Sequence, residues 1–139
     1  MRLRDYAPGP EDNATWRRLH DEAYAGGPDY SPMDDEELAL LRAREGFQLR
    51  FADVDGESIG FCQTHEYADQ IYINSLGLTP AWRGHGVGKS LLLDGIAHLR
   101  ERGYDEVRLT VRSDNTPAVG LYRDVGFEAE DVATTWWRE

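Results

Sequence analysis

The stretch with the clearest chemical potential is WRGHGVGKS, residues 82–90, in which three alternate glycines precede a lysine and a serine. Glycine-rich turns let the backbone approach a phosphate closely, because glycine has no Cβ. The last three residues also end a nucleotide-binding P-loop. That motif requires G-x-x-x-x-G-K-[ST], however, and counting back from Gly88 places Arg83 at the first glycine position. A loop that starts at Gly84 is one residue too short, so the spacing argues against a P-loop.

The dinucleotide-binding pattern G-x-G-x-x-G fails as well. Counted from Gly84 its last glycine falls on Lys89, and counted from Gly86 it falls on Leu91. A strand over residues 71–78, this turn and a long helix would nevertheless aim several unpaired backbone amides at one point, where the helix dipole adds positive charge. The stretch therefore predicts a phosphate or pyrophosphate site, with a ligand-free glycine-rich turn as the alternative.

Two segments carry a family resemblance. LGLTPAWRGHGVGKSLL resembles the central acetyl-CoA motif of the GNAT superfamily of N-acetyltransferases, [RQ]-x-x-G-x-[GA], with Arg83, Gly86 and Gly88 at the fixed positions. NTPAVGLYRDVGF resembles the C-terminal motif of the same family. The resemblance implies the GNAT fold, an α/β (α+β) fold with a mixed central sheet, splayed fourth and fifth strands and helices on both faces. It also implies acetyl-CoA as co-substrate.

By this resemblance the loop amides bind the pyrophosphate of coenzyme A, and the arm of the cofactor lies between strands over residues 71–78 and 107–111. Leu76 and Leu78 would offer backbone amides, and Asn115 would contact the arm or cap the short helix after it. The full set of expected cofactor-binding residues is Leu76, Leu78, Arg83, Gly84, His85, Gly86, Val87, Gly88, Lys89, Ser90 and Asn115.

Direct transfer of an acetyl group to an amine needs a neutral amine, a polarised carbonyl and a proton for the leaving thiolate. The resemblance assigns the proton to Tyr122, because family members commonly use the tyrosine at this position to protonate the sulfur of CoA. A phenol can donate a hydrogen bond at neutral pH. The alternative is a packing role, since Tyr122 shares a predicted helix face with Ala118 and Leu121.

The general base is marked less clearly. Some family members place a glutamate in the fourth strand, whereas this region carries Tyr72 and Asn74, with Asp69 at its start. Glu66 and His65, near the end of the preceding strand, are the candidates, and an unperturbed histidine titrates near neutrality. An ordered water or an amine of low pKa would need no dedicated base.

For the acceptor, the resemblance points to the first two helices and their link, YAGGPDYSPMDDEE. Tyr24, Asp29 and Tyr30 offer an aromatic and acidic wall that could hold a cationic amine. The acids at 34–37 are better explained as a first helical turn favoured by the helix dipole.

Composition limits the remaining choices. The 139 residues predict one domain over residues 1–139, and a net charge of −11 excludes nucleic acid as a partner while favouring cationic ones. Cys62 is the single cysteine, so neither an intrachain disulfide nor a thiolate metal cluster is expected. Since neither a signal peptide nor a membrane-spanning segment is apparent, we expect a cytoplasmic protein without a metal, either monomer or homodimer.

The hydrophobic periodicity predicts the element order β-α-α-β-β-β-α-β-α-β-β. The expected strands are 1–7, 47–54, 57–67, 70–79, 106–111, 127–131 and 133–139, and the expected helices are 11–25, 31–43, the glycine loop to 102, and 116–125. Ser31 is the expected N-cap of the second helix, with Pro32 in its first turn. Trp136 and Trp137 are adjacent in the last strand, so they should face opposite sides of the sheet.

These features together predict an acetyl-CoA-dependent N-acetyltransferase that acts on a primary amine of a small molecule or peptide by direct attack. The alternative is a catalytically silent acyl-CoA-binding regulatory module of the same fold. A P-loop phosphotransferase is a third class, and the loop spacing argues against it.

Overall fold

The computed structural model describes residues 1–25, 31–111, 115–129 and 135–138, with the backbone alone at 129 and 135–138. Within these residues the helices are α1 (Pro10–Tyr24), α2 (Asp35–Arg42), α3 (Val87–Glu101) and α4 (Thr116–Asp124), with a short 3-10 turn, η1, at Pro80–Trp82. The strands are β1 (Arg2–Asp5), β2 (Gln48–Val54), β3 (Glu57–Tyr67), β4 (Gln70–Leu78), β5 (Val107–Thr110), β6 (Glu128–Ala129) and β7 (Thr135–Arg138). The order of helices and strands predicted from the sequence is confirmed.

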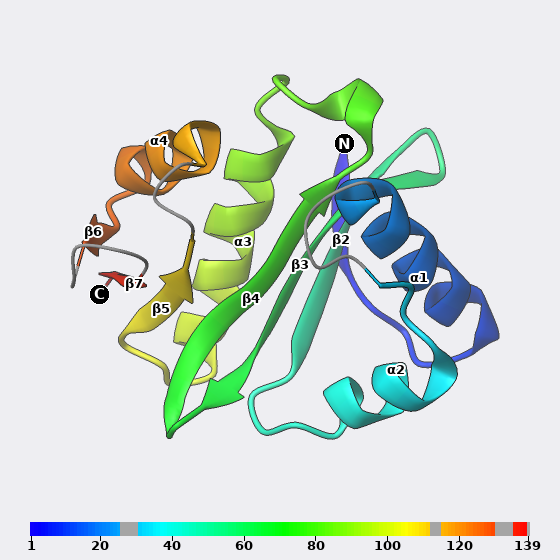
Figure 1. Ribbon diagram of the computed structural model, residues 1–139, viewed down its shortest axis with the longest axis horizontal. Helices are drawn as coiled ribbons and strands as arrows, with labels where there is room; N and C mark the ends of the chain where they lie inside the picture. The colour runs from blue at the N-terminus through cyan, green and yellow to red at the C-terminus, as the bar shows by residue number, and fades with distance from the viewer. Residues whose placement is uncertain (26–30, 112–114, 130–134, 139) are drawn as a thin grey trace.

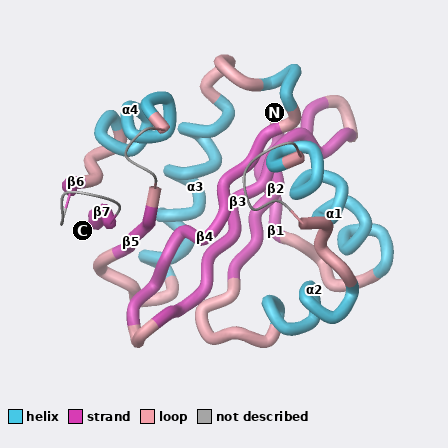
Figure 2. Tube along the Cα trace, in the orientation of Figure 1, coloured by secondary structure: helices cyan, strands magenta, loops and turns pink. Residues whose placement is uncertain are grey.

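The strands form one mixed sheet in the order β1-β2-β3-β4-β5-β7-β6 (Figure 2). Neighbouring strands are antiparallel except β4 and β5, which are parallel. A parallel pair needs a crossover connection, and α3 supplies it. The glycine loop therefore lies at the end of β4, where this crossover begins.

Helices cover both faces of the sheet, as predicted (Figure 1). On one face, Trp16 and Leu19 of α1 pack with Phe51 and Phe61 of the sheet in a buried cluster. On the other face, α3 and α4 pack over a second cluster that includes Cys62. Phe61 and Cys62 are consecutive in β3, so they point to opposite faces as the period of a strand requires. Both are completely buried, and β3 is buried over most of its length because helices cover both faces of the sheet.

Helix α2 begins later than the sequence analysis predicts. Its N-cap is Asp34, whose carboxylate accepts a hydrogen bond of 2.8 Å from the amide of Glu37, and Ser31 lies before the helix. Hydrophobic packing, in addition to this hydrogen bond, determines where the helix begins. Met33 and Leu38, directly before the cap and in the first turn, are both buried in the α1 cluster and fix the start of the helix as a hydrophobic staple.

Strands β4 and β5 separate after a short paired region. Their register contains only the pairs Tyr72–Arg108 and Ile73–Leu109, although β4 continues to Leu78. A bulge in the β3–β4 register leaves Asn74 without a partner, and bulges of this kind bend a strand. The predicted splay is confirmed, and Figure 1 shows the two strands diverging toward the glycine loop. In the described strands, the far half of β4 therefore keeps a free edge on the β5 side.

None of the described helices has the length and apolar character needed to cross a membrane.

Candidate active site

The glycine loop joins β4 to α3 in a left-handed backbone conformation. Gly86 is the N-cap of α3 with φ 81°, and Gly84 has φ 80°. A Cβ at either position would meet no described atom within 4 Å, so the loop faces open space there. Because the first amides of a helix have no partner within the helix, the start of α3 offers backbone donors to an anion. The geometry fits the phosphate site expected from the sequence.

The side chains of the loop are largely engaged elsewhere. Val87 is buried in the core, so only its backbone is free to contact a ligand. Lys89 makes an ion pair of 2.9 Å with Asp124 of α4, and both side chains are at least half exposed. The guanidinium of Arg83 donates to the carbonyl of Ala23 at 3.2 Å. The hydrogen-bond donors that the loop offers to a ligand are therefore mainly backbone amides rather than side chains.

The remaining expected cofactor residues lie around the same helix ends. His85 is exposed, and its ring lies 5.5 Å from the ring of Trp82. Ser90 is half-buried in the first turn of α3. Asn115 caps α4, since its side-chain oxygen accepts a hydrogen bond of 3.4 Å from the amide of Ala118.

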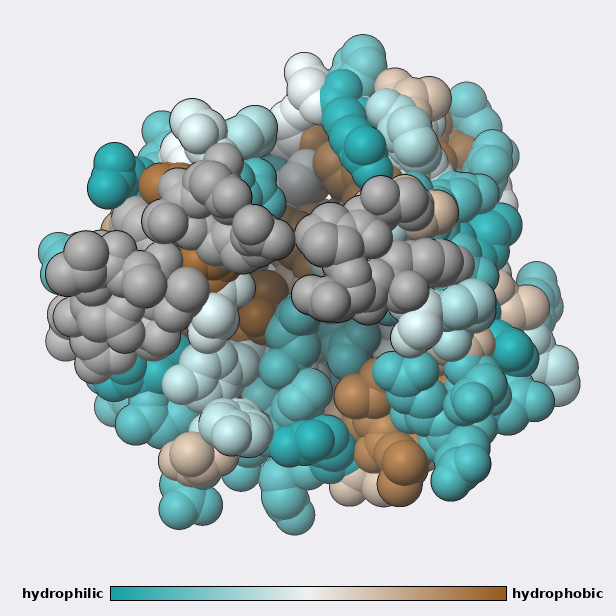
Figure 3. All heavy atoms as spheres, in the orientation of Figure 1, coloured by the Kyte–Doolittle hydropathy of each residue, from teal (hydrophilic) through white to brown (hydrophobic). Residues whose placement is uncertain are grey.

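A cavity of about 190 Å³, the α4 cavity, lies between β4, the start of α3 and α4. Its lining residues are Ala23, Tyr24, Leu76, Gly77, Leu78, Arg83, Gly88, Ala118, Leu121 and Tyr122. Of the expected residues it brings together Leu76 and Leu78 of β4, Arg83 and Gly88 around the start of α3, and Tyr122 of α4. In the orientation of Figure 1, hydrophobic residues show in a recess between α4 and α1 (Figure 3).

Tyr122 of α4 is half-buried at this cavity. Burial raises the pKa of its phenol to about 12, so the hydroxyl keeps its proton at neutral pH. The ring packs edge-to-face against Phe127, with 5.8 Å between the ring centres. No described residue forms a hydrogen bond with the Tyr122 hydroxyl. The side chain therefore has a packing role and also keeps a free proton donor at the cavity.

A second cavity of about 410 Å³, the α2 cavity, lies on the α1 and α2 side of the sheet. Its lining residues are His20, Tyr24, Ser31, Met33, Glu37, Leu41, Gln63, His65, Asn74 and Ser75. Tyr24 lines both cavities, and its hydroxyl lies 2.7 Å from the Ser75 hydroxyl and 3.4 Å from the Leu76 carbonyl oxygen. The two cavities therefore adjoin at Tyr24, beside the bulged part of β4.

The structure separates the two candidate bases. His65 is 8% exposed, lines the α2 cavity and has no hydrogen-bond partner for its Nδ1 within the described residues. Burial, with a smaller contribution from the charge of Arg44, lowers the pKa of His65, so the imidazole is neutral at pH 7. Glu66 follows it in β3 and points to the other side, where its carboxylate accepts a 2.7 Å hydrogen bond from Tyr104. Of the two candidate bases, His65 alone lines one of the two cavities.

Other acceptor residues named from the sequence are only partly placed. Tyr24 reaches the α2 cavity as expected. Asp29 and Tyr30 lie outside the described residues, as do the side chains of Trp136 and Trp137. Sequence reasoning missed Gln63, although its spacing of two from His65 in a strand places both on one face.

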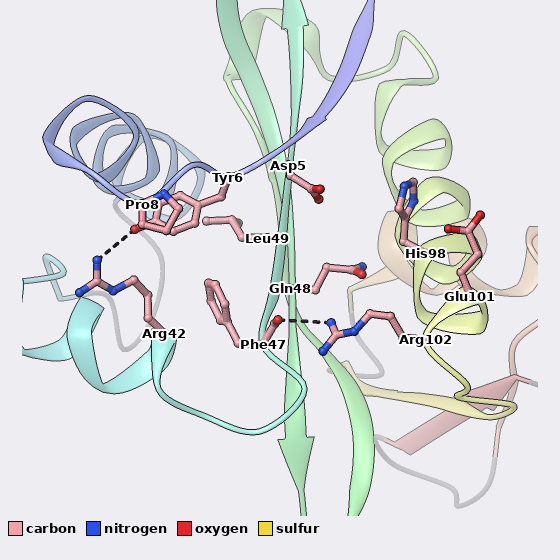
Figure 4. A pocket seen from close by; sticks show the side chains of 10 residues that line it. All are labelled: Asp5, Tyr6, Pro8, Arg42, Phe47, Gln48, Leu49, His98, Glu101 and Arg102. Carbon is pink, nitrogen blue, oxygen red and sulfur yellow. Dashed lines mark hydrogen bonds between the residues drawn. The ribbon is translucent and has the colours of Figure 1, made fainter.

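A third cavity, of about 430 Å³, lies at the far end of the sheet and contains none of the expected site residues. Figure 4 shows two arginines on either side of it, each already hydrogen-bonded. Arg42 donates to the Tyr6 hydroxyl and Arg102 to the Phe47 carbonyl, both at 3.3 Å. The described residues also contain no cluster of three or more His, Cys, Asp or Glu that could hold a metal ion.

Comparison with known proteins agrees with this geometry. The family model of the acetyltransferase (GNAT) family matches residues 13–127. Curated relatives include mycothiol acetyltransferases from Catenulispora acidiphila, 34% identical over 91% of this chain and 43% of the relative, and from Thermomonospora curvata, 35% identical over 90% and 43%. The chain thus spans less than half the length of these relatives.

A solved structure with the same fold is the PaiA N-acetyltransferase from Thermoplasma acidophilum in complex with coenzyme A. It has a TM-score of 0.80 and 24% identity, and the match covers 100% of this chain and 99% of that one. The sheet with its splayed strands, the left-handed glycine loop and the family match agree, and the chain belongs to the acetyltransferase (GNAT) family.

Proposed function

We propose that the chain is an acetyl-CoA-dependent N-acetyltransferase that transfers the acetyl group to a primary amine of a small molecule or peptide by direct attack. The observation that carries this proposal is the meeting of two cavities at Tyr24. One extends from the glycine loop past Tyr122, and the other is lined by His65. Two substrates bound from opposite sides would therefore meet beside β4.

For the cofactor side, the amides at the start of α3 and the left-handed glycines Gly84 and Gly86 would bind the pyrophosphate. The free edge of β4 would hold the arm, through the amides of Leu76 and Leu78. When bound, acetyl-CoA supplies the acetyl group as a thioester. The fit is supported by the open space at the two glycines and by the lining of the α4 cavity.

Tyr122 would donate the proton to the leaving thiolate. A pKa of about 12 makes the phenol a stable proton carrier at neutral pH, and the hydroxyl has no competing partner within the described residues. His65 would accept the proton from the amine, directly or through a water molecule. Its lowered pKa keeps it neutral and able to accept a proton at pH 7.

We propose that residues 1–139 form one such domain, while the location in the cytoplasm and the monomeric or dimeric state stay predictions. The acceptor is not fixed by the family. Amines related to mycothiol, which the names of the relatives mention, belong with other small amines and peptides in the set of acceptors to test.

The test is release of CoA thiol from acetyl-CoA in the presence of a panel of amines. The proposal predicts release that depends on the amine and falls when Tyr122→Phe is introduced. Binding of acetyl-CoA with release no faster than hydrolysis for every amine would instead identify a silent acyl-CoA-binding module.

A further inference from the structure

Two buried polar side chains of β3 face the α2 cavity without protein partners. Gln63 is 4% exposed and His65 is 8% exposed, and both line the cavity. Within the described residues, the buried Nδ1 of His65 has no hydrogen-bond partner. The side-chain amide of Gln63 lines the same cavity and is hydrogen-bonded to no other described residue. Because buried polar groups in proteins are nearly always hydrogen-bonded, the unpaired nitrogen of His65, with the Gln63 amide on the same strand face, points to a ligand that pairs with both.

The charges around the cavity restrict that ligand further. Of the described residues that line it, Glu37 is the single carboxylate, and none is lysine or arginine. A ligand carboxylate or phosphate would find no permanent cation there and would be repelled by Glu37. The net charge of the chain, −11, acts in the same direction.

The size and the remaining lining describe a compact, polar molecule. The volume of about 410 Å³ lies within the range of small-molecule sites. Asn74, at the bulge of β4, adds an exposed amide to the buried one of Gln63, while Met33 and Leu41 form an apolar wall. Amide side chains discriminate by hydrogen bonding, since a ligand that cannot pair with them leaves them desolvated and unsatisfied.

We infer that the acceptor is a small amine with a neutral hydrogen-bonding group, a hydroxyl or an amide, close to the reacting nitrogen, and that Gln63 selects it. Amino acids with a free carboxylate and simple alkylamines are poor acceptors. This inference rests on the proposed function, because it takes the amine in the α2 cavity to be the acetyl acceptor. It makes Gln63 a specificity-determining residue that contacts the substrate beside His65.

Matched amines test the inference. The first set is alaninamide, alanine and 3-methyl-2-butylamine, which share a shape and differ in carrying a carboxamide, a carboxylate or an isopropyl group. The second set compares glucosamine with cyclohexylamine and so tests hydroxyls. Affinity for the CoA-loaded protein is measured by calorimetry, and kcat/KM for acetyl transfer is measured per neutral amine.

We expect at least one neutral polar amine to exceed its matched partners by roughly tenfold or more in both readouts. The set that shows the preference tells whether an amide or hydroxyls are recognised. Equal or tighter binding of alanine or of the alkylamines would overturn the inference.

Gln63→Met removes the amide and keeps the length of the side chain. We expect this variant to prefer the neutral polar amine over its matched partners by less than about threefold. The change should come from a higher KM for the polar amine, because the discriminating hydrogen bonds are lost. Gln48→Met is the control, since Gln48 is also buried but already donates to the Gly95 carbonyl at 3.1 Å on the other face of the sheet. Retention of the full preference in a folded Gln63→Met protein would also overturn the inference.

The two proposals fail differently. Acetyl transfer without preference for neutral polar amines would contradict the inference and leave the transferase in place. Selective binding of these amines without acetyl transfer would support the inference about the cavity and contradict the proposed function.

Discussion

The two cavities that meet at Tyr24 are built in opposite ways. The α4 cavity and the glycine loop beside it rely on backbone: helix-terminal amides, left-handed glycines and a free strand edge. The α2 cavity relies on side chains from α1, α2, β3, β4 and the link before α2. A backbone site fits a ligand common to a whole family, whereas a side-chain site can change its ligand by single substitutions. This difference supports our proposal that the shared cofactor binds in the first cavity and the specific acceptor in the second.

The largest effect should come from Gly86→Val, which alters the backbone of the glycine loop. A β-branched residue is strained at φ 81°, and its side chain would fill the open space where the phosphate is expected. We expect acetyl-CoA affinity to fall at least about 100-fold, about 2.7 kcal/mol, by calorimetry.

Gly103→Val is the matched control for this strain. Gly103 follows the other end of α3 with φ 99°, and a Cβ there also meets no described atom within 4 Å. It should lose roughly 1–3 kcal/mol of stability and keep its acetyl-CoA affinity. Equal loss of affinity in both variants would show that strain, not the site, is responsible.

Tyr122→Phe should separate chemistry from binding at the α4 cavity. Loss of a general acid predicts a fall in kcat of roughly 100-fold with acetyl-CoA affinity nearly unchanged. Tyr104→Phe, which removes a hydroxyl bonded to Glu66 outside both cavities, should leave kcat unchanged. A parallel fall in kcat and cofactor affinity for Tyr122→Phe would assign it to packing alone.

His65→Gln should have an intermediate effect and a signature in pH. Because the pKa of His65 is lowered, the base is fully active at neutral pH and kcat/KM should fall on acidification with an apparent pKa below 6.5. We expect His65→Gln to lower kcat/KM roughly 10- to 100-fold and to remove this acidic limb. Glu66→Gln, its neighbour on the opposite face, should keep both the rate and the limb. The reverse pattern would make Glu66 the base.

Tyr24→Phe should have the smallest effect, because it removes only the hydroxyl at the junction of the cavities. Loss of its hydrogen bonds to Ser75 and Leu76 should cost about 1 kcal/mol and raise the KM of both substrates several-fold. A change in the KM of one substrate alone would show that the cavities act independently there.

The fold could be predicted almost completely from the sequence, because its signals are local. The hydrophobic periodicity predicted strands over residues 47–54 and 57–67 and a helix from the glycine loop to 102, and β2, β3 and α3 match these bounds closely. The predicted start of α2 was wrong, because several residues between 31 and 37 are able to cap a helix. Only the burial of Met33 and Leu38 selects Asp34.

The residues of the two cavities could be predicted from the sequence to different extents, again because only one set is local. The expected residues of the α4 cavity are adjacent in two short motifs, and the structure brings them together. The α2 cavity joins residues as far apart as His20 and Ser75, so no local pattern defines it. Strand alternation could have separated His65 from Glu66 and added Gln63. The free polar atoms of Gln63 and His65 become apparent only from tertiary packing.

The most direct test is a thermal-shift titration of the wild-type chain and Gly86→Val with acetyl-CoA and with Mg-ATP. Bound ligand at 100 times its Kd adds about 2.7 kcal/mol, a shift of a few degrees in a domain of this size. We predict stabilisation of the wild type by acetyl-CoA, none by Mg-ATP, and loss of the acetyl-CoA shift in Gly86→Val. Stabilisation by Mg-ATP alone would contradict the assignment and make the glycine loop a nucleotide site.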